Sequence, residues 1–492
     1  MTDAAGTSFV EEPGRKTPVA YDVDVVVAGA GIAGSIAAIA AGRQGAKVLV
    51  IDRFGQVGGN IGPGMFAGGG LTLGWTDPTD GNTRQGGMGG VPEEFHRRVI
   101  FSRPNADQIT EDVRKELDDR RCNVEEYRMG QGGGLPQYIV DSQECSHVLL
   151  EMMDEAGVEM LLSAYIGDPI MEGDRVAGVF VETKSGRVAV KAKVVVDGAS
   201  EADVCFRAGA PTAAVANPNL GTYYVLNDVD MDKYAQWVEA QPDPSDDDLR
   251  WSREHLATEE SEADPFPKLH HMLPQIRKAW EAGEFEIVRK IGDCAITITR
   301  KDNRVWDGMI GGRTGTRGTV DFSDAKMVTM MEREHREQIY KYARFMRKYV
   351  PGFEKCYLLL IAPYLNARGG RYLDSVYPIG GDDLSAERTF DDVIYRYHGK
   401  PQNTTDVPYR TLVPKKIDGL LACGTSSMRY GPNFRARYSM LLNGQAAGIA
   451  AALCVRDNVQ PRDLDVKKLQ RVLIKLHCPI GDDARMKELG LV

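Results

Sequence analysis

Residues 23–34 read VDVVVAGAGIAG, an apolar run that leads directly into Gly29, Gly31 and Gly34. The next residues, SIAAIAAGRQGA, predict a helix, and the run KVLVI predicts a second strand that ends at Asp52. Strand, glycine turn, helix, strand and terminal acid together form the βαβ fingerprint of a dinucleotide site. The alternative is a glycine-rich turn in an ordinary α/β protein, and the complete order of elements favours the dinucleotide site.

Each glycine of this turn has a predicted physical role. Gly29 permits the tight turn, Gly31 lets the backbone approach a pyrophosphate, and Gly34 lets the helix pack closely on the strand. The helix N-terminus offers free N–H groups and the positive end of its dipole to phosphates. Asp52 is placed to accept hydrogen bonds from ribose hydroxyls.

The segment after Asp52 indicates which dinucleotide is bound. Residues 53–60 read RFGQVGGN, and residues 61–75 read IGPGMFAGGGLTLGW. Glycine lets such a loop lie against a flat ligand, and its Met, Phe, Leu and Trp residues distinguish it from a solvated linker. An acid, a short spacer and the pair Gly58-Gly59 resemble flavoproteins of the glutathione-reductase-like FAD superfamily. In that superfamily this loop runs along the FAD pyrophosphate toward the isoalloxazine ring.

Composition sets the broad class. The chain has 492 residues, 42% of them hydrophobic and 26% charged, which predicts an ordinary globular protein of two domains. A formal net charge of −10 argues against nucleic acid as a partner. No apolar run reaches the ~18 residues of a membrane span. The eight cysteines form no CxxC pair, so we expect reduced thiols, no metal site and a cytoplasmic location.

The predicted fold is α/β, with a Rossmann-like FAD-binding domain built from a parallel sheet and a β-meander. The meander has expected strands at 175–182, 187–192 and 194–196, joined first by a turn at Lys184-Ser185-Gly186. Helices are expected at 107–120, 141–157, 323–350 and 444–453. The expected domain bounds are a flexible N-terminal arm at 1–20, a discontinuous FAD-binding domain at 21–211 and 405–492, and an inserted α+β substrate domain at 212–404.

Three separated stretches resemble one family, the FAD-dependent oxidoreductases related to the succinate dehydrogenase and fumarate reductase flavoproteins. They are residues 22–75, the meander with DGASEADVCFRAGAP, and residues 408–453. The resemblance implies FAD as the cofactor. It also implies a cofactor site formed by Gly29, Gly31, Ala33, Gly34, Asp52, Arg53, Gly58, Gly59, Asn60, Ile166, Gly424, Arg435, Asn443 and Gln445.

Some of these residues have a specific implied role. Ile166 would meet the adenine through its backbone, and Gly424 would bring the last strand close to the ribityl chain. Gln445 would start a closing helix whose N-terminus points at the flavin pyrimidine ring, where a helix dipole favours negative charge.

The chain also departs from the family pattern. Residues 197–201 read DGASE where the family has DATGD, and residues 368–372 read RGGRY where it has RESRR. Substrate specificity therefore does not transfer. Thr425 follows the last-strand glycine where flavin monooxygenases keep an acid, which counts against hydroxylase chemistry.

Five side chains are candidates for catalysis beside the flavin: Arg368, Arg371, Arg437, Tyr438 and His398. Guanidinium groups suit carboxylate or polyhydroxyl ligands, Tyr438 could shuttle a proton, and a histidine can act as a general base near neutral pH. The alternatives are structural ion pairs, a packed aromatic ring and a surface or packed histidine.

The functional prediction is hydride transfer between a small polar substrate, hydroxylated or carboxylated, and flavin N5. A fumarate-reductase-like reductase, a flavin-binding structural subunit without turnover and a nicotinamide-only dehydrogenase are the alternatives. The electron acceptor is left open, as is self-association into a homo-oligomer.

Overall fold

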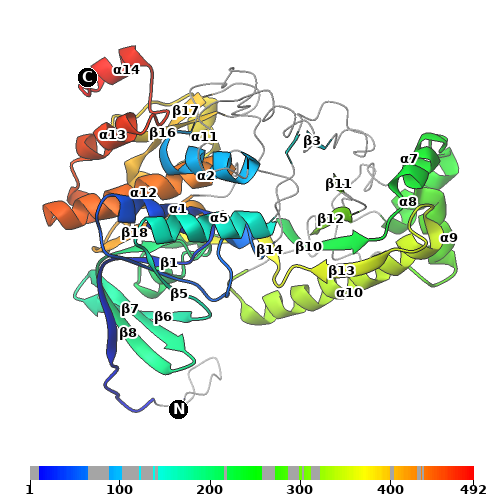
Figure 1. Cartoon of the computed structure of the whole chain (residues 1–492), viewed down its shortest axis with the longest axis horizontal. Coiled ribbons are helices and arrows are strands. Elements are labelled where there is room, and N and C mark those ends of the chain that lie inside the picture. Colours follow the sequence, from blue (N-terminus) through cyan, green and yellow to red (C-terminus); the bar gives the residue numbers. More distant parts are fainter. Residues whose placement is uncertain are drawn as a thin grey trace.

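The structure is a computed structural model of the whole chain. The residues that it describes are 10, 12–64, 88–101, 121–122, 137–138, 142–214, 219–256, 272–285, 299–301, 304–311, 322–368, 370–398, 404–428, 434 and 437–492. Figure 1 shows a sheet with covering helices at one end of the molecule and a second sheet beside one long helix at the other end.

The first sheet carries the glycine turn. Its strand order is β5-β2-β1-β8-β7-β6, with β18 paired to the end of β8. The strands are β1 Val19–Ala28, β2 Val48–Ile51, β5 Glu159–Leu161, β6 Tyr165–Glu172, β7 Arg175–Thr183, β8 Gly186–Asp197 and β18 Leu420–Ala422. Strands β5, β2, β1, β8 and β18 are parallel, and β6 and β7 are antiparallel. The predicted parallel sheet with a β-meander is therefore confirmed.

Both faces of this sheet are buried. Along β1, Val25 and Val27 belong to one apolar core, and Val26 and Ala28 belong to another on the opposite face. A parallel sheet needs such cover on both sides. The helices packed in the first core are α1 Ile32–Arg43, α2 Gly90–Phe101, α5 Ser142–Glu155 and α12 Arg437–Asp457, and α6 Asp203–Arg207 packs in the second.

The meander differs from the prediction in two ways. The predicted strands 187–192 and 194–196 are one continuous strand, β8, because Lys193 keeps the alternation of exposed and buried side chains. Its ammonium group lies 2.8 Å from the carboxylate of Asp24 on β1. The preceding strand, β6, was not predicted at all. Strand β1 also begins at Val19, inside the predicted flexible arm, because it pairs there with β8.

Helices α1 and α12 approach each other closely through glycines. A Cβ atom at Gly444 would overlap the carbonyl oxygen of Ala33, and one at Gly448 would overlap that of Ala37. The prediction that this helix begins at residue 444 was wrong, since α12 begins at Arg437. A glycine that normally weakens a helix interior is required here by the neighbouring helix.

The second sheet belongs to the inserted α+β domain. Its order is β11-β12-β10-β13, and β14 also pairs with β10. The strands are β10 Asn219–Asn227, β11 Thr299–Lys301, β12 Arg304–Gly311, β13 Tyr357–Ile361 and β14 Asn366–Arg368. The helices are α7 Met231–Glu239, α8 Asp246–Leu256, α9 Leu273–Glu281 and α10 Ala325–Tyr349. The bounds of this domain, 212 and 404, stay a prediction.

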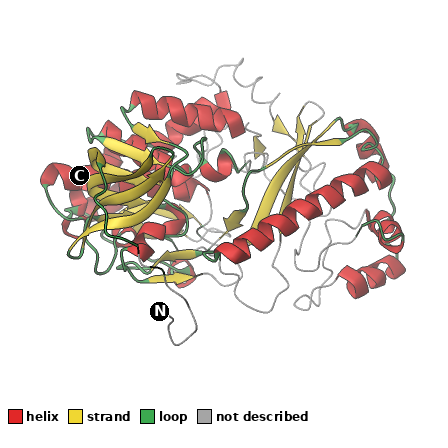
Figure 2. Ribbon diagram, turned by 90° about the horizontal axis from the view of Figure 1, so that it is seen from below, coloured by secondary structure: helices red, strands yellow, loops and turns green. Residues whose placement is uncertain are grey.

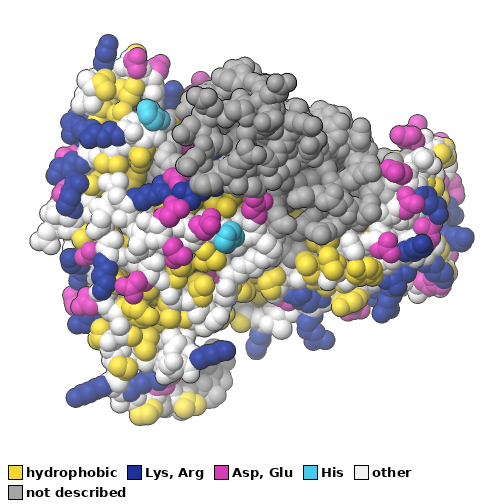
Figure 3. All heavy atoms as spheres, viewed as in Figure 1, with side chains coloured by type: hydrophobic (Ala, Val, Ile, Leu, Met, Phe, Trp, Pro, Cys, Tyr) yellow, Lys and Arg dark blue, Asp and Glu magenta, His cyan; other side chains and the backbone are white. Residues whose placement is uncertain are grey.

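The long helix α10 confirms the prediction for residues 323–350. The Asp324 carboxylate accepts hydrogen bonds from the amides of Lys326 and Met327, which caps the first turn. The helix ends before Pro351, and Figure 2 shows it lying across the second sheet. In Figure 3 hydrophobic side chains gather over α10 and β13, and Tyr357 and Leu359 of β13 are exposed.

Three short ladders complete the described strands. β9 Thr212–Ala214 pairs with β15 Arg371–Leu373, β16 Val393–His398 pairs with β17 Thr404–Pro408, and β3 Arg121–Cys122 pairs with β4 Gln137–Tyr138. The remaining α-helices are α11 Gly381–Ser385, α13 Val466–Lys475 and α14 Asp483–Glu488. The predicted helix at 107–120 lies outside the described residues.

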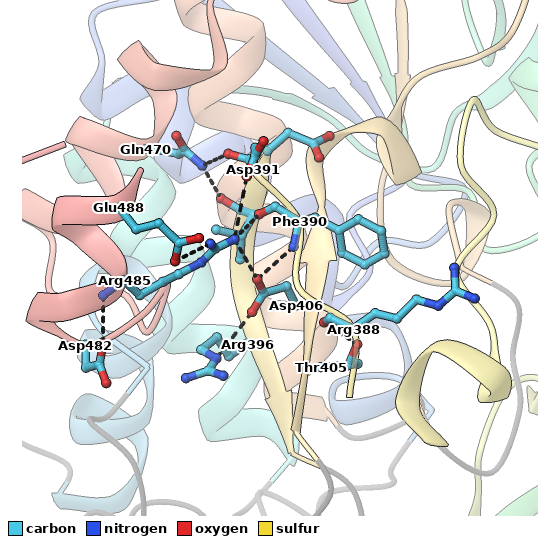
Figure 4. Close-up of polar contacts among 12 residues, drawn as sticks. Arg388, Phe390, Asp391, Arg396, Thr405, Asp406, Gln470, Asp482, Arg485 and Glu488 are labelled. Atoms are coloured by element: carbon cyan, nitrogen blue, oxygen red, sulfur yellow. Dashed lines mark hydrogen bonds and ion pairs between the residues drawn. The ribbon is translucent and has the colours of Figure 1, made fainter. Parts of the chain in front are cut away.

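A buried carboxylate fastens the C-terminal helices to the β16–β17 hairpin (Figure 4). Asp406 on β17 is 1% exposed and accepts a hydrogen bond from the Phe390 amide at 3.0 Å. Its oxygens lie 3.3 Å from the guanidinium of Arg396 and 3.6 Å from that of Arg485 in α14. Arg485 also donates to the carbonyl of Phe390. The C-terminus is therefore held by charge-assisted contacts as well as by apolar packing.

Among the described helices, α12 alone is long and apolar enough to cross a bilayer. Its apolar window is 94% buried inside the protein, as expected for a core helix.

Candidate functional site

The glycine turn after β1 is closely packed at two positions and open at the third. Gly29 has a φ of 105°, and a Cβ there would lie 2.6 Å from the carbonyl oxygen of Gly198. A Cβ at Gly34 would overlap the carbonyl oxygen of Gly29. A Cβ at Gly31 would meet nothing within 4 Å. The packing of the protein itself thus requires Gly29 and Gly34, whereas Gly31 faces open space at the N-terminus of α1.

Asp52 is fixed beside this turn by main-chain donors. Its carboxylate accepts hydrogen bonds from the amides of Ala30 at 2.6 Å and Phe54 at 2.8 Å. Burial raises the pKa of Asp52, and the hydrogen bonds from Phe54 and Ala30 oppose that shift. Each oxygen keeps a further lone pair for a hydroxyl donor.

The second glycine pair lies against the first turn. Gly58, with a φ of 101°, donates its amide hydrogen to the carbonyl of Ala30 at 2.8 Å. A Cβ at Gly59 would lie 2.9 Å from the Cα of Gly31. The segment RFGQVGGN therefore returns to the open position of the turn.

The inserted domain reaches this segment through Tyr364, a residue that the sequence did not single out. Its ring stacks on Phe54 with the centroids 4.6 Å apart, and its hydroxyl donates to the side-chain oxygen of Asn60 at 3.3 Å. The guanidinium of Arg53 lies 4.8 Å from the Phe54 ring centroid and 5.7 Å from that of Tyr364. The structure thus brings the predicted residues Arg53 and Asn60 together under a side chain from the other domain.

The loop after β8, which departs from the family's DATGD pattern, is held by the buried carboxylate of Asp197. It accepts hydrogen bonds from the amides of Ala199 at 3.0 Å and Cys205 at 2.9 Å, and from the hydroxyl of Ser426 at 3.2 Å. Burial raises the pKa of Asp197. Ser200 in this loop has a φ of 79°, so it adopts a left-handed conformation that non-glycine residues rarely take.

Glu201, in the same loop, was not predicted as a site residue. Its carboxylate lies against Gly370, where a Cβ would overlap it, and accepts the amide hydrogen of Arg371 at 2.9 Å. Burial raises the pKa of Glu201 to about 7, and the charge of Asp203 adds to the shift. The only signal in the sequence was the departure from DATGD, which says nothing about burial.

The end of β18 is tied to α12 through Asn443. Its buried side-chain oxygen accepts the amide hydrogen of Gly424 at 2.6 Å and the hydroxyl of Ser427 at 3.2 Å. Gly424 has a φ of 62°, and a Cβ there would lie 2.8 Å from the Cβ of Ala33 in α1. The predicted residues Ala33, Gly424 and Asn443 therefore meet in one place.

Gln445 does not have the predicted position. It lies in the interior of α12 because the helix begins at Arg437. Its buried side chain accepts the amide hydrogen of Val91 at 2.8 Å and donates to the sulfur of Cys478 at 3.0 Å. These contacts attach α2 and the C-terminal segment to α12. Ile166 lies in β6, and its carbonyl accepts a hydrogen bond from Arg207 at 3.0 Å.

The catalytic candidates separate into different environments. The guanidinium of Arg371 donates to the carbonyl of Glu201 at 2.9 Å and to Asp203 at 2.6 Å, and it stacks on Phe206 at 4.0 Å. Arg371 is thus engaged in a structural network. Tyr438 is buried and stacks on Tyr397, with ring centroids 5.7 Å apart, as its packed-aromatic alternative expects.

Arg437 begins α12 near a histidine that the sequence did not single out. His96 of α2 is buried, and burial together with the charge of Arg437 lowers its pKa to about 4. Arg368 and His398 lie at the ends of β14 and β16, and their side chains are outside the described part of the structure. Arg435 also lies outside it.

These features fit FAD. The open position at Gly31, the amides at the start of α1 and the return of Gly58-Gly59 form a place where a backbone can approach a pyrophosphate. All of them lie at the carboxyl ends of parallel strands, where open α/β sheets bind their ligands. Asp52, which follows β2, can accept hydrogen bonds from ribose hydroxyl groups.

Several known proteins are similar to this chain. A curated relative, the thiamine thiazole synthase of Sulfolobus acidocaldarius, is 30% identical over 184 residues, which are 35% of this chain and 54% of that protein. The chain thus matches about half the length of this relative.

Solved structures with similar folds include a geranylgeranyl bacteriochlorophyll reductase-like protein from Thermoplasma acidophilum, with 13% identity over 96% of this chain and 88% of that one and a TM-score of 0.41. Another is p-nitrophenol 4-monooxygenase from Pseudomonas putida, with 11% identity over 95% and 92% and a TM-score of 0.41. Residues 24–473 match the model of the FAD dependent oxidoreductase family, so this chain is an FAD-dependent enzyme that belongs to that family.

Proposed function

We propose that FAD lies along the carboxyl edge of the first sheet. Its pyrophosphate would face Gly31 and the start of α1, its adenosine ribose would face Asp52, and its ribityl chain would pass Gly424. The open space at Gly31 carries this proposal, because a dinucleotide fold needs its second glycine for the ligand and not for its own packing.

We further propose that the enzyme transfers a hydride between a small polar substrate and the flavin. FAD supplies the hydride-accepting N5 atom when it is bound. The protein must orient a C–H bond toward that atom and neutralise the charge of the substrate. Arg368 suits the second task, since it ends β14 three residues before Arg371, whose amide contacts Glu201. A guanidinium binds carboxylate or hydroxyl groups well.

The position of Thr425 favours oxidation or reduction over hydroxylation. Its hydroxyl lies 3.0 Å from that of Ser200 and donates to the Ser200 carbonyl at 3.1 Å. A neutral, engaged hydroxyl therefore stands where the monooxygenases of this superfamily keep an acid. Kinship with the succinate dehydrogenase and fumarate reductase flavoproteins is part of this proposal, as is a location in the cytoplasm.

The test is spectroscopic. Purified protein should be yellow, and its visible flavin absorbance should bleach when a 2-hydroxy acid or a polyol is added without oxygen. Bleaching by none of a broad panel of such compounds would contradict the proposed oxidation.

The alternatives predict other results. A fumarate-reductase-like enzyme would regain its colour, after chemical reduction, on addition of fumarate or another enoate. A structural flavin subunit would respond to neither treatment, and a nicotinamide-only dehydrogenase would be colourless.

A further inference from the structure

The loop that carries Glu201 lies beside the place proposed for the FAD phosphates. Its loop leaves the carboxyl end of β8, next to β1, and the carbonyl of Gly198 packs directly against Gly29. Ser200 connects the same loop to Thr425 at the end of β18. The crevice outside these strand ends is where a dinucleotide fold holds its ligand.

The described cations do not neutralise this carboxylate. The guanidinium of Arg371, on β15, turns to Asp203 and to the main-chain carbonyl of Glu201, so the carboxylate receives only the Arg371 amide. Asp203, in α6, adds a second negative charge nearby. The charges of Arg371 and of Arg53, in the loop after β2, lower the pKa of Glu201 only at longer range. Among the described residues, no cation lies within ion-pair distance of Glu201.

A dianionic pyrophosphate would therefore add two negative charges to those of Glu201 and Asp203. The charges of two carboxylates and a pyrophosphate repel one another, and the partial burial of Glu201 weakens the screening of this repulsion by solvent. The least costly relief is protonation of the carboxylate that has the fewest hydrogen-bond donors. Asp203 has the Arg371 guanidinium as its partner, and the fully buried Asp197 accepts three hydrogen bonds. The Glu201 carboxylate accepts only the amide hydrogen of Arg371.

We propose that FAD binding takes up one proton from solvent onto the carboxylate of Glu201, which is released again when FAD dissociates. This inference rests on the FAD placement given under the proposed function. No bond other than the O–H bond of the carboxylic acid forms or breaks. The result is that cofactor affinity depends on pH near neutrality, even though FAD itself does not titrate there.

The direction in which FAD affinity changes with pH follows from the linkage between proton binding and FAD binding. The pKa of Glu201 is about 7 without FAD, and a nearby pyrophosphate raises it further. The complex then binds more protons than the free protein at pH values above about 7, so affinity falls as pH rises through that range, by at most tenfold per pH unit. Below about pH 6 the carboxyl is protonated in both states, and the affinity is constant.

The experiment measures FAD binding to the apoprotein by quenching of flavin fluorescence, from about pH 6 to about pH 9. The wild type should weaken about tenfold or more over this range, and Glu201→Gln, which mimics the protonated acid, should change less than about twofold. Glu182→Gln, an exposed carboxylate on β7, should keep the slope of the wild type.

A second measurement does not depend on any variant. Calorimetric titration at about pH 8, in two buffers with different ionisation enthalpies, should show net uptake of about 0.4 proton or more per FAD. Binding that is independent of pH, or a slope in Glu201→Gln equal to that of the wild type, would overturn the coupling but leave the FAD site intact. Absence of FAD binding at every pH would overturn both.

Discussion

The amide hydrogen of Arg371 is donated to the carboxylate of Glu201 across 2.9 Å, between residues 170 positions apart in the sequence. This contact joins the antiparallel pair β9–β15 to the loop beside the glycine turn. It also leaves the Arg371 side chain free to bind Asp203, so one residue holds both the main chain and the acidic neighbour of Glu201. The loop beside the glycine turn is therefore held in part by β15.

Replacing Arg371 by lysine should lower stability more than it changes substrate binding. Lysine cannot donate to the Glu201 carbonyl and to Asp203 together, and it stacks less well on Phe206. We expect a loss of about 1–2 kcal/mol in the free energy of unfolding, measured in urea. A large rise in KM with unchanged stability would instead restore the predicted role of Arg371 as a substrate ligand.

Alanine at Gly370 should disturb Glu201 without disturbing the fold. The new Cβ overlaps the Glu201 carboxylate, which is the flexible end of a side chain and can move into solvent. The pKa of the displaced carboxyl should return toward its ordinary value of about 4.5. The pH range over which FAD affinity falls should then shift downward by at least about one unit, measured by fluorescence titration.

Alanine at Gly31 and alanine at Gly34 should have opposite effects. Gly31→Ala adds a methyl group to open space, so we expect an unchanged melting temperature and at least about tenfold weaker FAD binding. Gly34→Ala forces a methyl group onto the Gly29 carbonyl and should cost about 3 kcal/mol of stability.

Gly380→Ala is the matched control for this pair, because it also points into open space but lies at the start of α11. Gly380→Ala should change neither the melting temperature nor the affinity for FAD. If Gly31→Ala bound FAD as the wild type does, the proposed position of the pyrophosphate would be wrong.

Mild acid should destabilise the protein through two buried histidines. Burial lowers the pKa of both His96 and His335 to about 4, with smaller effects from Arg437 and Arg336. The unfolded chain binds protons near pH 6.5 and the folded chain does not, so stability falls as pH decreases from about 6.5 to about 4. Each histidine can contribute up to about 3 kcal/mol to this loss.

Urea unfolding at about pH 7.5 and about pH 4.5 measures this effect. His335→Gln should show a smaller loss between the two pH values than the wild type, whereas the exposed His147→Gln should show the same loss. Equal losses in all three proteins would mean that His335 is not buried in its neutral form.

Asparagine at Asp406 should loosen the C-terminal helices. The substitution removes the buried charge that faces both Arg396 and Arg485 (Figure 4) and leaves two guanidinium groups without it. We expect a loss of about 2–4 kcal/mol in the free energy of unfolding. Asp391→Asn removes an exposed carboxylate 3.8 Å from the same Arg485 and should cost less than about 1 kcal/mol. Equal losses of unfolding free energy in the two variants would show that the burial of Asp406 does not make its charge more important for stability.

Local patterns in the sequence predicted much of the framework. The spacing of Gly29, Gly31 and Gly34 between two strands defined the βαβ unit, and the helix predicted at 323–350 matches α10 closely. The turn at Lys184-Ser185-Gly186 was also correct, since Gly186 has a φ of 106°. These features depend on backbone conformation and side-chain periodicity within a few residues, which is information that the sequence holds locally.

Contacts between distant residues decided the rest. Gly444 was misread as a helix start because only the approach of α1 explains a glycine inside α12. The side chain of Gln445 is engaged by Val91 and Cys478. That of Glu201 packs against Gly370 and accepts the amide hydrogen of Arg371. Burial and pKa arise from the atoms that surround a group in space, and those atoms come from segments that no local pattern brings together.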